Sequence, residues 1–315
     1  MRHILAEEID AALNFPELVD ALAAAFVGGI VAPPRHHHAL ERPGYAKATM
    51  LLMPAWSAPD AGEAFLGVKL VNVFPSNAAL GLPAVNGVYV LQSGVSGLSL
   101  ASLDGTRLTH WRTAAASALA ARYLARVDAR KLLIVGAGAL APFLARAHAS
   151  VRPIEHISVW NHRREGAQAL VNQLRQAGFP AALAQDLEPA VREADIISCA
   201  TLSATPLVLG AWLNPGQHVD LVGAFDFAGR EADDAALHRA RVFVDTSAAL
   251  IEGGDVAQAL RSGAMSREHV LADLPGLIGG AIGRTSPEDI TLFKSVGAAV
   301  EDLAAAMLVW RKVRR

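Results

Sequence analysis

The segment KLLIVGAGALA at residues 131–141 restricts the fold of this chain more than any other segment. Its apolar run predicts a buried strand, and the glycine-rich turn that follows leads directly into a predicted helix. In a dinucleotide-binding turn the first glycine, Gly136, permits the tight bend, and the second, Gly138, lets the backbone approach a pyrophosphate. Ala139 and Leu140 complete the turn, and the N-terminus of the helix would attract the phosphate anion. We therefore expect a dinucleotide site here.

Strands and helices alternate after this turn. The apolar runs are HISVW, DIISCA, HVDLV and RVFVD, and each follows a helical or loop segment. This alternation predicts an α/β fold with a Rossmann-type, doubly wound parallel sheet. A tight turn without a ligand would show the same short glycine motif, but the order of strand, turn, helix and second strand favours dinucleotide binding. Further on, Ser286-Pro287-Glu288-Asp289 has the residues of a helix start and predicts a long helix to about Trp310.

The N-terminal part of the chain shows a different pattern. Apolar residues at helical spacing predict one or two helices over Ile9–Val27. Short apolar runs bounded by Pro, Gly or Asn fill Thr49–Leu103, as is typical of hairpin or meander strands. Asp104-Gly105 predicts a two-residue turn. A helix rich in Ala and Leu is expected after Arg112, as a connector between two domains.

Composition excludes several classes of protein. The chain has 315 residues, 28 Lys plus Arg against 30 Asp plus Glu, and a single cysteine. This length predicts about two domains, and a net charge of −2 offers no basic surface for nucleic acid. A lone cysteine fits a reducing compartment. Acids interrupt the N-terminal apolar pattern, and Pro and Asn interrupt the long uncharged stretches, so we expect no export signal, no membrane span and a cytoplasmic location.

The end of the second Rossmann strand normally decides which dinucleotide is bound. A carboxylate there would hydrogen-bond the ribose 2′-hydroxyl of NAD, but this chain has Asn161-His162-Arg163-Arg164. These amide, imidazole and guanidinium groups suit a 2′-phosphate, although arginines at a solvated helix start would look the same. We expect NADP(H) as the preferred cofactor and NAD(H) as the alternative.

Three cations are candidates for contact with a substrate. Lys69 lies inside a predicted strand and precedes 34 uncharged residues. Burial there would lower its pKa and suit proton transfer, whereas a lysine that reaches from the strand into water is the alternative. Arg35 and Arg112 could each clamp a carboxylate or pair with a local acid.

Two further features are expected to carry no chemistry. The consecutive residues His36-His37-His38 cannot all face one ion, and no Asp, Glu or Cys stands beside them at ligand spacing. We therefore expect no metal site, and a loop histidine that touches substrate is the alternative. Cys199 ends an apolar strand and is expected to fill the core.

Several segments together resemble one protein family. They are GVKLVNVFPSN, LDGTRLTHWRTAAASALAARYLA, the VGAGA turn with the later WNHR, LVGAFDFAGRE and DITLFKSVGAAVEDLAAA. On these segments the chain resembles the ornithine cyclodeaminase/mu-crystallin family over nearly its whole length. The resemblance implies a Rossmann domain at residues 119–295. It also implies a discontinuous α+β substrate and dimerisation domain, made of residues 1–118 and 296–315, and a homodimer.

The resemblance also implies roles for single residues. Lys69 matches the family's active-site lysine, Arg112 an arginine near both substrate carboxylate and cofactor, and Arg35 an arginine that meets the substrate carboxylate. Other positions match loops that contact the cofactor in the family, and they are Thr201, Val222, Gly223, Ser295 and Val296.

Two departures from the family pattern change the expected chemistry. Leu140 replaces a frequent glutamine, and Phe225 stands where cyclodeaminases carry a catalytic aspartate, with Asp226 one residue further on. Cyclodeamination needs a carboxylate that shuttles protons, whereas hydride delivery to a preformed imine does not. We therefore expect an NAD(P)H-dependent reductase of small cyclic imino acids, such as pyrroline-2-carboxylate or piperideine-2-carboxylate. The alternatives are an ornithine cyclodeaminase that uses Asp226 and a non-catalytic, NADP-dependent binding protein like mu-crystallin.

Overall fold

The chain folds into two compact units. The computed structural model describes residues 1–58 and 63–314. Unit 1 comprises Met1–Thr113 and Ala298–Arg315, and unit 2 comprises Ala114–Gly297. The sequence predicts boundaries at 118/119 and 295/296, a few residues from these. The first boundary falls inside one continuous helix, α3 (Gly105–Leu124), so local sequence does not mark it.

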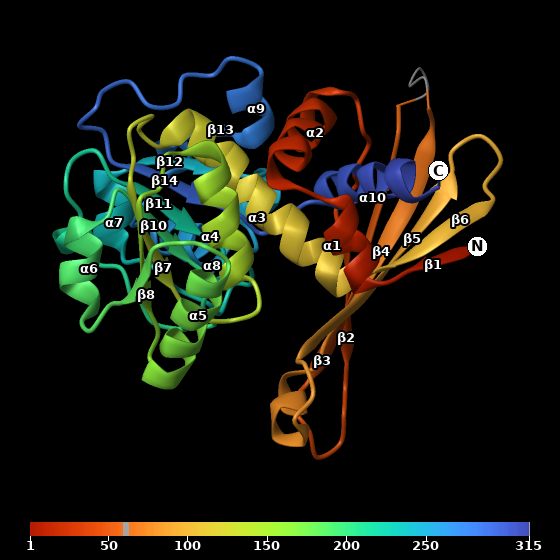
Figure 1. Ribbon diagram of the computed structural model, residues 1–315, viewed down its shortest axis with the longest axis horizontal. Helices are drawn as coiled ribbons and strands as arrows, with labels where there is room; N and C mark the ends of the chain where they lie inside the picture. The colour runs from red at the N-terminus through yellow and green to blue at the C-terminus, as the bar shows by residue number, and fades with distance from the viewer. Residues whose placement is uncertain (59–62, 315) are drawn as a thin grey trace. The chain divides into compact units, whose positions relative to one another are not determined.

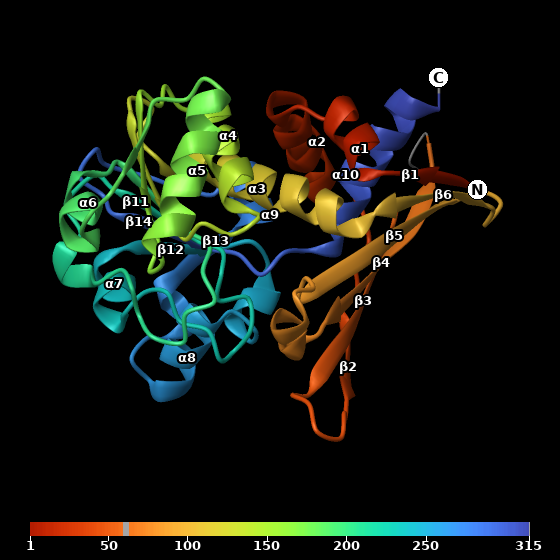
Figure 2. The same ribbon diagram turned by 60° about the horizontal axis from the view of Figure 1, so that its bottom comes forward.

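Unit 1 is a six-stranded sheet with helices α1, α2 and α10 on one face (Figures 1 and 2). The sheet order is β1-β6-β5-β4-β3-β2, in which β1 is parallel to β6 and all other neighbours are antiparallel. The strands are β1 Arg2–Ile4, β2 His36–Leu40, β3 Ala48–Trp56, β4 Phe65–Val73, β5 Val85–Ser93 and β6 Ser99–Asp104. The helices are α1 Ala6–Ala12, α2 Phe15–Val27, α10 Ala299–Val313 and the short 3-10 helix at Pro75–Leu80.

Strand alternation in unit 1 determines which side chains lie under the helices. In β4 every second residue is buried, and Lys69 is among these buried residues. Tyr89 of β5 stands directly opposite Lys69 in the sheet register and is also buried. Because successive side chains of a strand point to opposite faces, Lys69 and Tyr89 share the face that α10 covers.

Unit 2 is an eight-stranded, fully parallel sheet in the order β13-β12-β14-β11-β10-β7-β8-β9. Figure 1 shows α4 and α5 on one face and α6 and α7 on the other. The strands are β7 Lys131–Val135, β8 His156–Trp160, β9 Ala181–Leu183, β10 Ile196–Cys199, β11 His218–Leu221, β12 Arg241–Val244, β13 Val270–Asp273 and β14 Thr291–Lys294. The helices are α4 Ala141–Val151, α5 Arg164–Gln176, α6 Leu187–Glu193, α7 Asp234–Arg239, α8 Gly254–Ser262 and α9 Leu274–Ile278, with 3-10 helices at Gly210–Trp212, Ser247–Leu250 and Arg267–His269.

This topology confirms the doubly wound sheet. The chain runs outward from β7 through β8 to β9 and then returns to β10 on the other side of β7. In open parallel sheets, ligands bind outside the carboxyl ends of the strands where the strand order reverses. Here that point lies between β7 and β10, directly beside the glycine-rich turn that follows β7.

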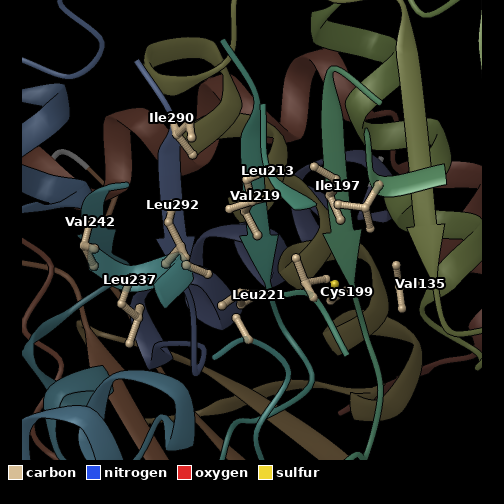
Figure 3. Close-up of a cluster of buried hydrophobic side chains, with 14 of the residues drawn as sticks. Val135, Ile197, Cys199, Leu213, Val219, Leu221, Leu237, Val242, Ile290 and Leu292 are labelled. Atoms are coloured by element: carbon tan, nitrogen blue, oxygen red, sulfur yellow. The ribbon is translucent and has the colours of Figure 1, made fainter. Parts of the chain in front are cut away.

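The core of unit 2 consists of aliphatic side chains from the central strands, because a parallel sheet is covered on both faces. Figure 3 shows side chains from these strands packed together, among them Val135, Ile197, Cys199, Val219, Leu221 and Leu292. Cys199 is fully buried within this cluster, and burial raises its thiol pKa well above the usual value. Cys199 therefore fills the core, as expected.

Two predictions from the sequence are wrong, namely the turn at Asp104-Gly105 and the helix start at Ser286. Asp104-Gly105 is a helix start and not a turn, because the Asp104 carboxylate accepts a hydrogen bond from the Arg107 backbone N–H at 2.7 Å and α3 begins at Gly105. No helix begins at Ser286. The Asp289 carboxylate instead accepts from the backbone N–H groups of Thr285 and Ser286, which closes a turn before β14. The last helix, α10, begins only at Ala299, after Gly297 at φ +79°.

The structure also shows how the N-terminal helices and the three consecutive histidines are arranged. The N-terminal helical region divides into α1 and α2, because the Asn14 side chain caps α2 by accepting from the Glu17 backbone N–H at 3.0 Å. The three consecutive histidines are the first residues of edge strand β2 and are not in a loop, since they pair with β3. Among residues 1–58 and 63–314, no helix combines the length and apolarity that crossing a bilayer requires.

Candidate active site

A buried cluster of four charges lies under α10 in unit 1. Asp302 Oδ1 accepts hydrogen bonds from Lys69 Nζ at 2.8 Å and from Arg112 Nε at 2.9 Å. Arg112 also donates to Glu301 Oε2 at 2.8 Å. All four side chains are at least nine-tenths buried. Two cations and two carboxylates thus balance in a region from which water is largely excluded.

Three elements bring this cluster together. Lys69 projects from the covered face of β4, and Arg112 lies on α3 one turn after Thr109, whose hydroxyl accepts a hydrogen bond from Lys69 Nζ at 3.2 Å. Glu301 and Asp302 lie in the first turn of α10. The partial positive charge at a helix N-terminus stabilises carboxylates there, so α10 holds the two acids against the two cations.

The surroundings of Lys69 make its ammonium a weak acid near neutral pH. Burial and the positive charge of Arg112 lower the pKa of Lys69 from 10.5 to about 8, and the charges of Asp302 and Glu301 limit the fall. At pH 7 the side chain is therefore mostly protonated, yet it can release its proton within the range in which enzymes work. Lys69 therefore has the properties of a proton donor, and Arg112 is a guanidinium held beside it by Asp302 and Glu301.

The sequence predicts Lys69 and Arg112 as site residues, and in the structure both bind the Asp302 carboxylate. Arg35, the third predicted cation, is half-buried and lies just before edge strand β2. Strand β3 lies between β2 and β4, the strand that carries Lys69. Sequence reasoning missed Glu301 and Asp302. The signal was an acidic pair in the otherwise apolar segment VEDLAAAM.

The predicted dinucleotide turn in unit 2 has the required backbone. Gly136 has φ +104°, and a Cβ on it would lie 2.7 Å from the Ala200 carbonyl oxygen, so only glycine fits. A Cβ on Gly138 would meet nothing within 4 Å, and both Gly138 and Ala139 are exposed. Leu140 begins α4. The turn therefore leaves an open approach for a pyrophosphate in front of α4.

The cationic segment after β8 lies at the same edge of the sheet, because β7 and β8 are neighbouring parallel strands. His162, Arg163 and Arg164 are exposed. The Asn161 side chain donates to the Arg163 carbonyl oxygen at 2.8 Å, which orders the turn into α5. These side chains could hold a phosphate or ribose next to the glycine-rich turn.

The remaining predicted cofactor residues follow the other central strands at this edge. Thr201 comes just after β10, Val222 and Gly223 follow β11, and Ser295 follows β14. The backbone N–H of Ser295 donates to the Leu221 carbonyl oxygen at 3.1 Å. The ends of β11 and β14 are thus joined, and the predicted residues line the carboxyl edge of the sheet.

Asp226, the candidate substitute for the cyclodeaminase aspartate, lies in the loop after β11. Its side chain is exposed, and Oδ1 accepts hydrogen bonds from the backbone N–H groups of Ala228 and Gly229 at 3.1 and 3.0 Å. Phe225 is half-buried. The Asp226 carboxylate therefore stabilises a turn of its own loop.

Comparisons with known proteins agree with this arrangement. The sequence model of the ornithine cyclodeaminase/mu-crystallin family matches residues 3–315. A Δ1-pyrroline-2-carboxylate reductase of Paracoccus denitrificans is 43% identical over 271 residues, which cover 85% of this chain and 84% of that protein. The Thermococcus litoralis Δ1-pyrroline-2-carboxylate reductase in complex with NADH and L-proline has a TM-score of 0.93 and 30% identity, covering 100% of this chain and 98% of that one. An archaeal alanine dehydrogenase dimer with bound NAD has a TM-score of 0.91 and 31% identity, covering 100% and 96%.

The Asp302→Asn substitution should strongly destabilise the protein, because Lys69 and Arg112 would stay buried with only Glu301 to balance them. Removing one partner of a buried ion pair typically costs about 3–5 kcal/mol. The control is Asp128→Asn, which removes an ion pair between an exposed carboxylate and the partly exposed Arg126 and should cost less than about 1 kcal/mol. Urea unfolding of both variants measures the difference, and equal losses would contradict the role given to Asp302.

Proposed function

The chain belongs to the ornithine cyclodeaminase/mu-crystallin family, and we propose that it is an NAD(P)H-dependent reductase of small cyclic imino acids. The proposed substrates are pyrroline-2-carboxylate and piperideine-2-carboxylate. The observation that carries the proposal is the pairing of Lys69 and Arg112 on Asp302, which supplies a proton donor beside a carboxylate anchor. Relatives named Δ1-pyrroline-2-carboxylate reductase, with 34–43% identity to this chain, support the substrate class.

Reduction of a cyclic imine adds one hydride to carbon and one proton to nitrogen. A bound NAD(P)H would supply the hydride. Arg112, together with Arg35, would hold the substrate carboxylate through guanidinium hydrogen bonds. The Lys69 ammonium would donate its proton to the imine nitrogen as that nitrogen gains electron density, and solvent would then reprotonate the lysine.

The loop after β11 favours reduction over cyclodeamination. Cyclodeamination requires a further base that moves protons while ammonia leaves. The family resemblance matches Phe225 to the position of that base, and the neighbouring Asp226 carboxylate is held by two backbone N–H groups of its own turn. Ornithine cyclodeamination therefore has weaker support than imine reduction.

We also infer a cytoplasmic location from the single cysteine, Cys199, which is buried and free. Proteins of oxidising compartments more often carry paired cysteines. The composition supports neither a nucleic-acid partner nor a membrane partner, and the expected partner is a small imino or amino acid.

The first test is a direct assay of the purified protein with NADPH and pyrroline-2-carboxylate. We expect steady oxidation of NADPH with formation of proline, and no ammonia when ornithine and NAD(P)⁺ are supplied instead. Ammonia release from ornithine would identify a cyclodeaminase. Tight NADPH binding without turnover of either cyclic imine would identify a non-catalytic binding protein.

The Lys69→Met variant should lose a factor of about 10²–10⁴ in kcat/KM, because general acid catalysis contributes on that scale. NADPH binding should survive, since the proposed cofactor residues lie in unit 2. Lys47→Met is the matched control, because Lys47 is an exposed lysine of the same unit. In the parent protein, imine reduction should decline as the pH rises through about 8, where Lys69 loses its proton. A Lys69→Met protein that binds NADPH and keeps activity within about threefold of the parent would refute the mechanism.

Preference for NADPH over NADH is proposed from the exposed cations after β8. The two solved relatives hold NADH and NAD, so the preference rests on this segment of the present chain. Arg163→Ala should narrow the difference in binding free energy between NADPH and NADH by about 1–3 kcal/mol, the scale of a charged hydrogen bond. Arg192→Ala, which removes an exposed arginine of α6, is the control. Equal dissociation constants of the parent for both cofactors would contradict the proposal.

A homodimer is proposed from the face of the unit 1 sheet that lies opposite the helices. Apolar residues stand side by side there in the register of β3, β4 and β5, namely Leu52, Pro54, Trp56, Leu66, Val68, Leu70, Val88 and Val90. All are at least partly exposed, Trp56 to 42% and Val88 to 39%. A contiguous apolar surface of this kind is typical of a protein interface.

Sedimentation should therefore show a dimer at micromolar concentration. Val88→Glu should shift the protein towards monomer, because a buried unpaired carboxylate is costly at an interface. Val127→Glu, at an exposed position in unit 2, should leave the dimer intact. A parent protein that sediments as a single monomeric species would contradict the proposed homodimer.

A further inference from the structure

Glu231 is a fully buried acid that the proposed mechanism does not use. Its Oε1 accepts hydrogen bonds from the Thr201 backbone N–H at 2.7 Å and from the Thr201 hydroxyl at 2.8 Å. Its Oε2 accepts from the Gly223 backbone N–H at 2.7 Å. One carboxylate thus ties the residue that follows β10 to the loop that follows β11.

A second layer of buried charges holds Glu231 in place. Asp255 Oδ1 accepts hydrogen bonds from the backbone N–H groups of Glu231 and Ala232 at 2.7 and 2.9 Å. Lys294 Nζ lies 3.3 Å from Asp255 Oδ2 and donates to the Leu221 carbonyl oxygen at 3.2 Å. Asp255 and Lys294 are fully buried. Glu231 is therefore a fixed link between the two strand ends.

The backbones joined by Glu231 also lie unusually close together. A Cβ on Gly223 would lie 2.0 Å from the Thr201 carbonyl oxygen and 2.5 Å from Glu231 Oε1. Such distances exclude any side chain at residue 223. The spacing between the two strand ends therefore depends on a glycine and on the carboxylate that bridges them.

The topology indicates which half of a dinucleotide these strand ends would face. The glycine-rich turn after β7 would hold the pyrophosphate, and the cationic segment after β8 would hold the adenosine half. Because β10 and β11 lie on the opposite side of β7 from β8, the nicotinamide half would extend over their ends. Thr201 and Gly223, both bound to Glu231, therefore border the nicotinamide half-site.

We propose that Glu231 is a positioning residue for the nicotinamide half of the cofactor. It acts through Thr201 and Gly223, whose spacing it sets, and does not itself touch the cofactor. A charged acceptor makes stronger hydrogen bonds than a neutral one, which suits this task. The inference rests on the proposed function only in assuming that the protein binds NAD(P)H.

Glu231→Gln tests the inference with little change in volume. The Thr201 and Gly223 backbones both donate, so the amide nitrogen of a glutamine would face another donor and break one of the two links. The probes are NADPH and 2′-phospho-ADP-ribose, which contains the adenosine half and the pyrophosphate but lacks nicotinamide. We expect the dissociation constant of NADPH to rise about tenfold or more and that of 2′-phospho-ADP-ribose to change less than about twofold, because only the nicotinamide half-site is altered.

The control is Glu188→Gln, which changes an exposed acid of α6 in the same unit and should alter neither dissociation constant. Equal weakening of both ligands by Glu231→Gln would show a general structural role and overturn the proposal, as would unchanged binding of both. Failure of imine reduction in the parent protein would count against the proposed function alone, since the ligand titrations need no turnover.

Two further measurements cover the case in which Glu231→Gln does not fold. Glu231→Asp shortens the side chain, so that its carboxylate can reach only one of the two strand ends, and the same selective loss of NADPH affinity is expected. In the parent protein, hydrogen exchange at the Thr201 and Gly223 amides should slow with NADPH more than with 2′-phospho-ADP-ribose. Equal slowing by both ligands would overturn the proposal.

Discussion

A single carboxylate oxygen, Asp302 Oδ1, joins the three elements on which the chemistry of unit 1 depends. It accepts hydrogen bonds from Lys69 of β4 and Arg112 of α3, and it belongs to the first turn of α10. Burying ions costs free energy that their mutual attraction only partly recovers. Replacing a buried ion cluster by apolar side chains of similar volume is often neutral or stabilising, so stability alone does not explain these charges. Burial and the positive charge of Arg112 lower the pKa of Lys69 to about 8, and the charges of Asp302 and Glu301 limit that fall.

The sequence predicts those parts of the fold that depend on local residues. Gly136 has a positive φ, which favours glycine, and the pattern of apolar strand, glycine-rich turn and helix is local, so this turn can be predicted without the rest of the chain. The start of α10 cannot be predicted from local residues in this way. Ser286-Pro287-Glu288-Asp289 has the composition of a helix start, but the four-residue strand β14 follows, because burial between β11 and β12 outweighs local preference.

The residues of the candidate site also differ in whether the sequence alone predicts them. Lys69 is conspicuous in sequence because a long uncharged stretch follows it, and the family resemblance identifies Arg112. Asp302 is 233 residues from Lys69, and an acid in the first turn of a helix is ordinary whether or not it has a cation as partner. Its role depends on the packing of α10 against β4, which no local pattern contains. Glu231 cannot be predicted from the sequence for the same reason, since its partners are backbone N–H groups and one hydroxyl of residues that are not adjacent to it in the chain.

Asp302 and Glu231 are both buried carboxylates, but they differ in what they bind, and this difference separates their roles. Asp302 binds Lys69, which can gain or lose a proton, so Asp302 affects the pKa of a group that can transfer a proton. Glu231 binds backbone amides and a hydroxyl, none of which titrates near neutral pH, so its proposed role is to fix geometry. Imine reduction needs one proton for each hydride, and Lys69 can supply it. Cyclodeamination needs a further proton acceptor that imine reduction does not, so the single lysine of the cluster suits the simpler reaction.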